Sequence, residues 1–247
     1  MCLHHTIFYE AAVRIAIMQP YFFPYLGYFQ LIHAVDAFVF LDDVAFIKKG
    51  WINRNRLAFN GKITWFTVPL SGQSQHTLIR DIRVARKELL PWQRKFIRSL
   101  WHFYGKSPFY QTTAQLVEEV LSHESESMAD LAKAAIAACC RLLGITSRLI
   151  DSSSAFPARG LCGEERLVDL CKQAGATEYV NPSGGITLYT KETFARHGIG
   201  LHFLCSNGIE YQAGGVRHGM EFSILDALMW YGPERLAGNL LRQYRLC

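Results

Sequence analysis

One short unit near the start of the chain restricts the fold more than any other feature. Apolar runs at 14–18 and 37–41 predict two strands, and residues 25–35 between them show the periodicity of a helix. Two strands joined by one short helical crossover are parallel neighbours in a sheet, because such connections are right-handed. The unit therefore predicts an α/β fold built on a mainly parallel sheet.

The rest of the chain continues this alternation. Further strands are expected at 63–69, 148–150, 178–181 and 200–204, and further helices at 87–103, 113–123, 127–143, 164–174 and 190–196. Several of these helices stop at a glycine, the usual residue for a left-handed C-terminal cap. We therefore expect a mainly parallel, Rossmann-like sheet covered on both faces, with a helical insertion or subdomain at about 86–143.

Composition bounds the size and the partners of the protein. The 247 residues are half hydrophobic, and we expect residues 14–247 to form a single α/β domain behind a disordered extension at 1–13. No apolar run approaches the roughly 20 residues that a membrane-spanning helix needs, so no transmembrane segment is expected. The net charge of +5 suits a small anionic ligand as well as a membrane surface, but it falls short of the basic stripe typical of nucleic-acid-binding folds.

The cysteines indicate a reducing compartment. There are seven, with no C-x-x-C pair and no cysteine–histidine spacing typical of a zinc site, so no protein-bound metal centre is expected. The segment 1–13 lacks the basic start and the uninterrupted apolar stretch of a signal peptide. Reduced thiols and a cytoplasmic location follow as expectations.

Polar residues follow the first two predicted strands, where a ligand site is expected. Gln19 and Pro20 come directly after the first strand, and Asp42 and Asp43 after the second. The carboxyl ends of parallel neighbours lie side by side, and open α/β sheets bind ligands at that edge. We predict Asp42 and Asp43 as exposed catalytic residues that act as a base, hold a sugar hydroxyl or bind Mg²⁺. The alternative is that they only cap the loop.

A basic and aromatic segment follows the acidic pair within a few residues. It contains Lys48, Lys49, Trp51, Arg54 and Arg56. Arginine binds phosphate or carboxylate through two parallel hydrogen bonds, lysine supplies a point charge, and tryptophan offers a stacking surface. We predict that this segment binds the anionic part of a ligand, with an ordinary solvated strand face as the alternative.

A glycine-rich turn follows the predicted strand at 178–181. We assign Asn181, Gly184, Gly185 and Tyr189 to the ligand site, because a Gly-Gly turn exposes backbone amides that suit an anion. The same sequence suits any tight turn, which is the alternative. Arg166 is a plausible neighbour of this turn, with a position on a helix surface as the alternative. This turn and the two strand ends described above are expected to face one crevice.

The loop Pro24-Tyr25-Leu26-Gly27-Tyr28 places a proline and a glycine just after the first strand. Its position resembles that of the ATP-binding loop in adenylyl-transferring HIGH-motif enzymes, such as pantothenate synthetase. Gly27 is expected beside the same crevice as Gln19 and the acidic pair, and Tyr28, which stands in place of the second histidine, is assigned to the ligand site with it. Both histidines of that motif are missing, and no lysine loop follows downstream, which argues against nucleotide transfer. Phosphate-loop, zinc-protease, nucleophile-elbow and dinucleotide motifs are also absent.

Several stretches of the chain resemble one known family. They include MQP-YFFP-YLGYFQLI at 18–32, VD-FVFLDDV-F at 35–46, KKGWINRNRL at 48–57 and ERLVDLCKQAGATEYVNPSGG at 165–185. From about residue 14 to the C-terminus the chain is similar to the WbqC-like family, bacterial proteins found among genes for O-antigen and other surface polysaccharides. The resemblance implies a pathway, that of lipopolysaccharide or a related polysaccharide, and not a reaction.

Two hypotheses of function follow. The first is a cytoplasmic enzyme of polysaccharide biosynthesis, a transferase or ligase that acts on a nucleotide- or acyl-activated sugar precursor. The second is a non-catalytic accessory protein that binds a sugar nucleotide or a partner enzyme of the pathway. The expected ligand is a small anionic molecule, a nucleotide sugar or an acyl donor, and no nucleic-acid partner is expected. The cofactor is left open, with Mg²⁺ beside a nucleotide as the candidate.

Overall fold

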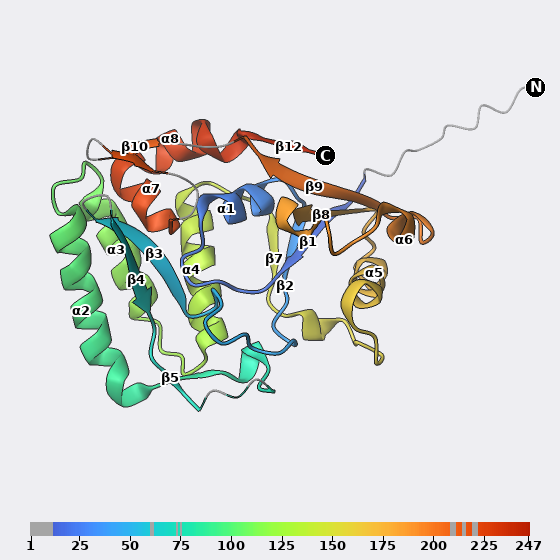
Figure 1. Ribbon diagram of the computed structural model, residues 1–247, viewed down its shortest axis with the longest axis horizontal. Coiled ribbons are helices and arrows are strands. Elements are labelled where there is room, and N and C mark those ends of the chain that lie inside the picture. Colours follow the sequence, from blue (N-terminus) through green and yellow to red (C-terminus); the bar gives the residue numbers. More distant parts are fainter. Residues whose placement is uncertain are drawn as a thin grey trace, which may run out of the picture.

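The computed structural model describes residues 12–59, 62–72, 74, 76–207, 211–213, 216–218 and 222–247, and a six-stranded sheet lies at its centre (Figure 1). The strand order is β12-β9-β8-β1-β2-β7. The strands are β1 Arg14–Met18, β2 Ala37–Phe40, β7 Arg148–Ile150, β8 Glu178–Pro182, β9 Gly200–Ser206 and β12 Tyr244–Leu246. All neighbours in this sheet pair in parallel except β12 and β9, which are antiparallel. The predicted mainly parallel α/β sheet is therefore confirmed.

The predicted strand–helix–strand unit lies in the middle of this sheet. β1 and β2 pair in parallel, with Ile15 opposite Ala37 and Met18 opposite Phe40. The crossover helix α1, Leu26–His33, is shorter than expected and buried over most of its length. From β1 the chain adds β2 and β7 on one side and later adds β8 and β9 on the other, so the strand order reverses between β1 and β8. The finer Rossmann-like assignment stays a prediction.

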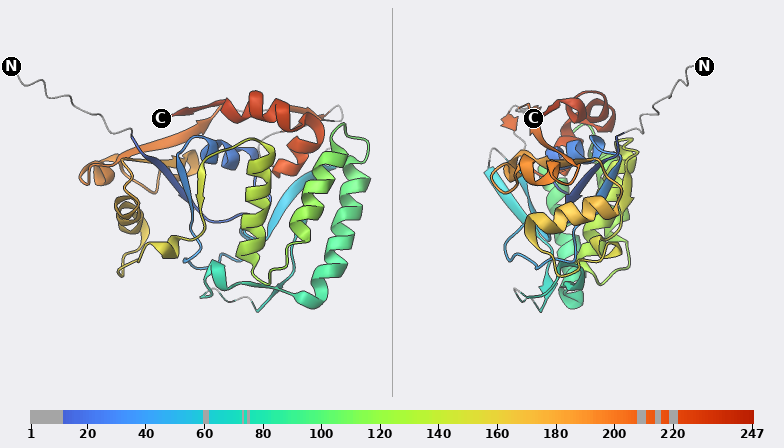
Figure 2. Two further views of the ribbon diagram at one scale, coloured as in Figure 1. Left: turned by 180° about the vertical axis from the view of Figure 1, so that it is seen from behind. Right: turned by 90° about the vertical axis from the view of Figure 1, so that its right-hand side faces the viewer.

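Both faces of the sheet are covered by helices (Figures 1 and 2). Ala16 and Phe38 pack into a larger core with residues of α1 and α4, whereas Ile15, Ile17 and Val39 pack into a second core with residues of α5. Successive strand residues point to opposite faces, so a strand buried on both faces needs an unbroken apolar run. The two covering helices are α4 Met128–Leu142 and α5 Gly163–Gln173.

The chain between β2 and β7 contains the expected helical segment. It consists of α2 Arg86–Tyr104, α3 Tyr110–Leu121 and α4, which stand side by side at one end of the molecule (Figure 2). α2 contacts α3, and α3 contacts α4. Each of the three buries one apolar face, which is why the segment packs as a layer. The number of domains stays a prediction.

The strand expected at 63–69 is present, but it lies outside the main sheet. β3 Arg54–Phe59, which the sequence analysis did not predict, and β4 Lys62–Thr67 form a separate two-stranded antiparallel ribbon. Only Asn60 and Gly61 separate the two strands in the sequence. That connection is too short for a parallel crossover, and the dipeptide is typical of hairpin turns.

The remaining elements are short. They are β5 Leu70–Ser71 paired with β6 Arg83–Val84, β10 Tyr211–Ala213 paired with β11 Val216–His218, the helices α6 Lys191–Ala195, α7 Ile224–Tyr231 and α8 Pro233–Gly238, and the 3₁₀ turns η1 Ile79–Asp81, η2 Ser153–Ala155, η3 Ser183–Gly185 and η4 Leu240–Arg242. Residues 1–11 of the expected extension lie outside the described residues, whereas the carbonyl of Val13 accepts hydrogen bonds from the amides of Thr177 and Glu178. No helix among the described residues is long and apolar enough to cross a membrane.

Candidate functional site

Five parallel strands end at the same edge of the sheet, and the loops that follow four of them carry the candidate site. β8, β1 and β2 are direct neighbours, and β7 lies next to β2. Gln19 and Asp42 therefore follow strands that end at the same edge as β8, which carries Asn181 near its end. That these strand ends face one ligand crevice stays a prediction. The loop after β7, which contains η2, reaches the same edge. Between β1 and β8 the strand order reverses, and open α/β sheets bind ligands at such a point.

Asp42 is the buried member of the acidic pair, with only 1% of its surface exposed. Its Oδ2 lies 2.8 Å from Nζ of Lys133, and its Oδ1 accepts a hydrogen bond from Oγ of Ser152 at 2.5 Å. Its backbone N–H donates to Oγ of Ser153 at 3.3 Å. The expectation that both carboxylates are exposed is wrong for Asp42, because α4 and η2 close over the strand end and supply a counter-charge and hydrogen-bond donors.

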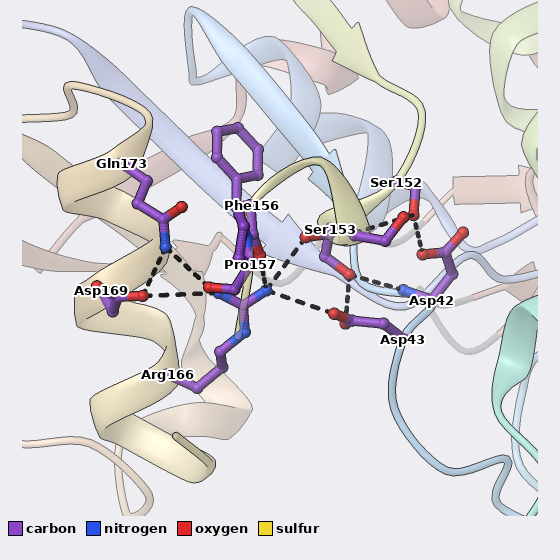
Figure 3. A network of polar contacts seen from close by, with 10 residues as sticks. Asp42, Asp43, Ser152, Ser153, Phe156, Pro157, Arg166, Asp169 and Gln173 are labelled. Atoms are coloured by element: carbon purple, nitrogen blue, oxygen red, sulfur yellow. Dashed lines mark hydrogen bonds and ion pairs between the residues drawn. The ribbon is translucent and has the colours of Figure 1, made fainter. Parts of the chain in front are cut away.

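Asp43 lies beside Asp42 but faces other partners (Figure 3). Ser153 donates its hydroxyl to Oδ1 at 2.5 Å, and Nη2 of Arg166 lies 3.4 Å from Oδ2. Arg166, on α5, also donates to the carbonyl oxygens of Ser153 and Phe156 at 3.1 and 2.5 Å. The side chain of Asp43 is 14% exposed. Asp43 is therefore the carboxylate of the pair that a ligand can reach.

A groove of about 480 Å³ opens next to the Asp42–Lys133 pair. Its lining includes Phe40, Leu149 and Asp151 from the sheet side and Lys133 from α4. Nζ of Lys133 lies 3.5 Å from Oδ1 of Asp151 as well as 2.8 Å from Asp42. Because Lys133 is held between two carboxylates, its charge is compensated within the protein.

The network restricts the chemistry that the acidic pair can support. Both carboxylate oxygens of Asp42 are engaged by protein partners. No group of three or more His, Cys, Asp and Glu side chains within the described part of the chain could hold a metal ion. A Mg²⁺ ion at this edge would need most of its ligands from a nucleotide and water, with Asp43 as the protein oxygen. The arrangement supports proton acceptance or hydrogen bonding by Asp43 directly.

Most of the site residues predicted at the end of β1 and in the loop after it are buried and support the backbone, and only Gln19 is partly exposed. Tyr28 is buried, its hydroxyl donates to the carbonyl oxygen of Gln19 at 2.8 Å, and burial raises its pKa well above the ordinary value. Gly27 and Pro20 are buried as well, whereas Gln19 is half-buried. Tyr28 therefore fixes the backbone at Gln19, and Gln19 is the member of this group best placed to contact a ligand.

The turn after β8 is shaped by close packing. A Cβ atom on residue 185 would lie 1.8 Å from Nδ2 of Asn181, so Gly185 is required there. Asn181 is buried and accepts a hydrogen bond from the Tyr179 hydroxyl at 3.2 Å, and Tyr189 packs edge-on against the Tyr179 ring. The tight-turn alternative thus accounts for Asn181 and Gly185, whereas Gly184 is exposed with open space around it.

The basic and aromatic segment forms a stacked cluster on the β3–β4 ribbon. The rings of Trp51 and Trp65 stack with centres 5.5 Å apart. The guanidinium of Arg54 lies 4.4 Å from the centre of the Trp65 ring, and that of Arg56 lies 5.0 Å from the centre of the Trp51 ring. Arg54 also donates to two backbone carbonyls of the preceding loop. The two arginines thus lie on an outer strand face, the alternative that the sequence left open.

Two asparagines fix the ribbon in place: Asn53 closes its base, and Asn55 attaches it to the loop after β1. The amide of Asn53 donates to the carbonyl of Val68 at 2.8 Å, and that of Asn55 donates to the carbonyl of Phe23 at 2.7 Å, in the loop after β1. The carbonyl of Trp51 also accepts a hydrogen bond from that loop. Lys48 and Lys49 are exposed on the connection between the acidic pair and the ribbon.

Sequence reasoning missed three of the residues that hold the acidic pair. Ser152 and Ser153 follow a predicted strand at the same edge, and that position could have identified them. Lys133 gave no such signal, because it is a single basic residue on the apolar face of an alanine-rich helix. Arg166 was expected near this edge or on a helix surface, and the folded sheet brings it to Asp43.

The fold and the ion-paired strand ends define an α/β protein with a candidate ligand site at the carboxyl edge of a parallel sheet. Residues 19–237 match the WbqC-like protein family, and the chain belongs to this family, as its motifs predicted. It is 31% identical over 237 residues to the uncharacterized protein Rv1507c of Mycobacterium tuberculosis, an alignment that covers 94% of this chain and 99% of that protein. No solved structure matches the chain.

Proposed function

We propose that this protein is an enzyme of bacterial surface-polysaccharide biosynthesis, O-antigen included, that transfers or ligates a group on a nucleotide- or acyl-activated sugar precursor. The resemblance to the WbqC-like family supports the pathway. The observation that carries the enzymatic part is the setting of Asp43. This ionisable side chain is partly exposed and is held by Ser153 and Arg166 at the carboxyl edge of a parallel sheet.

Asp43 is suited to accept a proton from the acceptor sugar. Transfer of an acyl or glycosyl group to an amine or a hydroxyl requires the acceptor to lose a proton, and a carboxylate within hydrogen-bond reach can take it. Ser153 and Arg166 fix the orientation of that carboxylate. The buried Asp42–Lys133 pair anchors the same strand end, so Asp42 acts by positioning.

The anionic part of the donor is assigned to the loops beside Asp43. Lys48 and Lys49 are exposed on the loop that begins at the acidic pair, and neither forms an ion pair with another of the described residues, so their positive charge is available to a ligand. Gln19 and the exposed backbone at Gly184 come from the two strands between which the order reverses. A phosphate or carboxylate would find hydrogen-bond donors on both sides of this point.

A ligand panel tests the proposal. The protein is melted alone and with nucleotides, nucleotide sugars and acyl donors. A ligand at ~100 times its Kd should add roughly 2.7 kcal/mol to the free energy of unfolding. Ligands that stabilise are then incubated with amino- and hydroxyl-bearing sugars, and products are sought by mass spectrometry. Binding with product formation supports the enzyme, whereas a panel without any binder contradicts the proposed ligand class.

The second candidate function is a non-catalytic accessory protein. Ile186 and Leu188 on the loop after β8, and Ile47 on the loop after β2, are exposed large apolar side chains on the loops that follow the strand ends. A partner enzyme of the pathway would cover them on binding. On this alternative, a sugar nucleotide binds without turnover, and Leu188→Asp abolishes association with the partner while ligand binding is unchanged.

A further inference from the structure

Two cysteines are brought together by the pairing of β9 and β12. Cys205 lies opposite Arg245 in the antiparallel register, and two residues further along the backbones of Phe203 and Cys247 exchange hydrogen bonds of 3.0 and 2.9 Å. The sulfur atoms of Cys205 and Cys247 are in contact, 2.6 Å apart. Strand pairing therefore holds these two thiols next to each other, independently of the candidate ligand site.

This pair is more accessible than the three buried cysteines of the described residues. Cys139, Cys140 and Cys171 are buried, and burial raises the pKa of the Cys140 and Cys171 thiols to about 12. Such thiols carry almost no thiolate at neutral pH and react slowly. Cys247 is exposed and Cys205 is half-buried, so a small oxidant can reach the pair. The hydrogen bond with Cys247 raises the pKa of Cys205, which favours Cys247 as the first thiol to react.

We propose that Cys205 and Cys247 form a redox modification site, at which a small disulfide of the glutathione class converts the two thiols into an intramolecular disulfide between β9 and β12. The thiolate of Cys247 attacks one sulfur of the small disulfide, releases one small thiolate and becomes a mixed disulfide. Cys205 then loses its proton to water, attacks the Cys247 sulfur and releases the second small thiolate. Two protein thiols are oxidised, and one small disulfide is reduced to two thiols.

The modification would fasten an outer strand of the sheet. β12 is paired with β9 over three residues, so few backbone hydrogen bonds hold it in the reduced protein. A disulfide closes the loop between the two strands and restricts the unfolded chain. The oxidised protein should therefore melt roughly 5–15 °C above the reduced protein.

Peptide mapping of the full chain tests the proposal. The protein is equilibrated in glutathione buffers of increasing oxidised fraction, trapped with a maleimide and digested. We expect one cross-linked peptide pair that contains Cys205 and Cys247, while Cys139, Cys140 and Cys171 remain thiols. Maleimide on both Cys205 and Cys247 at the most oxidising ratio would overturn the proposal, and so would a disulfide that joins two protein molecules instead.

Two serine variants sharpen this test, because Cys247 and Cys162 are both exposed. Cys247→Ser should lose the cross-link and the melting difference between oxidised and reduced protein, and should leave at most a mixed glutathione disulfide on Cys205. Cys162→Ser should keep both the cross-link and the melting difference. If the melting difference survives in Cys247→Ser, another thiol is responsible and the assignment is wrong.

Discussion

Asp42 and Asp43 are adjacent residues of the same type, but the fold places their side chains in different surroundings. Asp42 is sealed between Lys133 and Ser152, whereas Asp43 keeps part of its surface open and is oriented by Ser153 and Arg166. A buried charge that loses its partner is costly, while an oriented and accessible carboxylate is useful to chemistry. Loss of charge at Asp42 should therefore affect folding, and loss of charge at Asp43 should affect turnover.

Asp42→Asn should destabilise the folded protein by about 3–5 kcal/mol, because it leaves the buried ammonium of Lys133 without its nearest counter-charge. Urea unfolding measures the loss. Asp151→Asn is the matched control, since Asp151 pairs with the same lysine but its side chain is 87% exposed, and it should cost less than about 1 kcal/mol. Equal stability of Asp42→Asn and the parent would contradict the structural role of this ion pair.

Asp43→Asn should lower turnover by about 10²–10⁴-fold, the usual contribution of a general base, while donor binding persists. The assay is the transferase or ligase reaction identified by the ligand panel. Asp151→Asn, which changes a carboxylate of the neighbouring groove, should keep turnover near that of the parent. Full activity of Asp43→Asn would remove this residue from the catalytic step.

At the scale of elements, the sequence predicts those that depend on local patterns, but it does not predict which side chains pair across long stretches of the chain. The β1–α1–β2 unit follows from apolar runs a few residues apart, and its parallel pairing is confirmed. The sequence did not predict β3, because Arg54 and Arg56 interrupt the apolar pattern of this strand on its outer face. The dipeptide Asn60-Gly61 does indicate a hairpin turn. Lys133 and Asp42 are 91 residues apart in the sequence, so no local sequence pattern could predict their ion pair.

The 3₁₀ turn η3, which directly follows β8, should tolerate a methyl group at Gly184 and not at Gly185. Gly185→Ala places a Cβ 1.8 Å from Nδ2 of Asn181, so the turn must open, at about 1–3 kcal/mol of stability. Gly184→Ala meets nothing within 4 Å and should be near neutral. Denaturant unfolding of the two variants compares them directly.

The same turn offers a rescue experiment. Asn181→Ala shortens the side chain that occupies the space at residue 185, so adding it to Gly185→Ala should recover part of the lost stability. Strictly additive losses in the double variant would show that the two residues do not compete for one space.

At the scale of the whole molecule, mild acid should weaken the fold through His33. Its Nδ1 is buried without a hydrogen-bond partner in the described part of the chain, and burial, followed by the charge of Arg242, lowers its pKa below 6.5. The unfolded chain then binds the proton more readily, so the stability is present above about pH 6.5 and is lost as the pH falls through the lowered pKa. Melting temperatures from about pH 8 to pH 5 should show this slope.

Substitution identifies the histidine responsible. His33→Gln removes the titrating group and should flatten part of the slope, whereas His123→Gln, at an exposed position after α3, should leave it unchanged. An identical slope in His33→Gln and the parent would assign the acid sensitivity to other groups.

β1 is the strand on which the two cores meet, since Ala16 faces one and its neighbours Ile15 and Ile17 face the other. Loss of the core on one face of the sheet would therefore also weaken the packing of the core on the other face. A fragment cut between β7 and α5 would keep β1 but leave Ile15 and Ile17 without much of their packing surface. We therefore expect the two fragments to aggregate when they are separated. They should regain solubility only when they are mixed, because each completes one of the two cores that share β1.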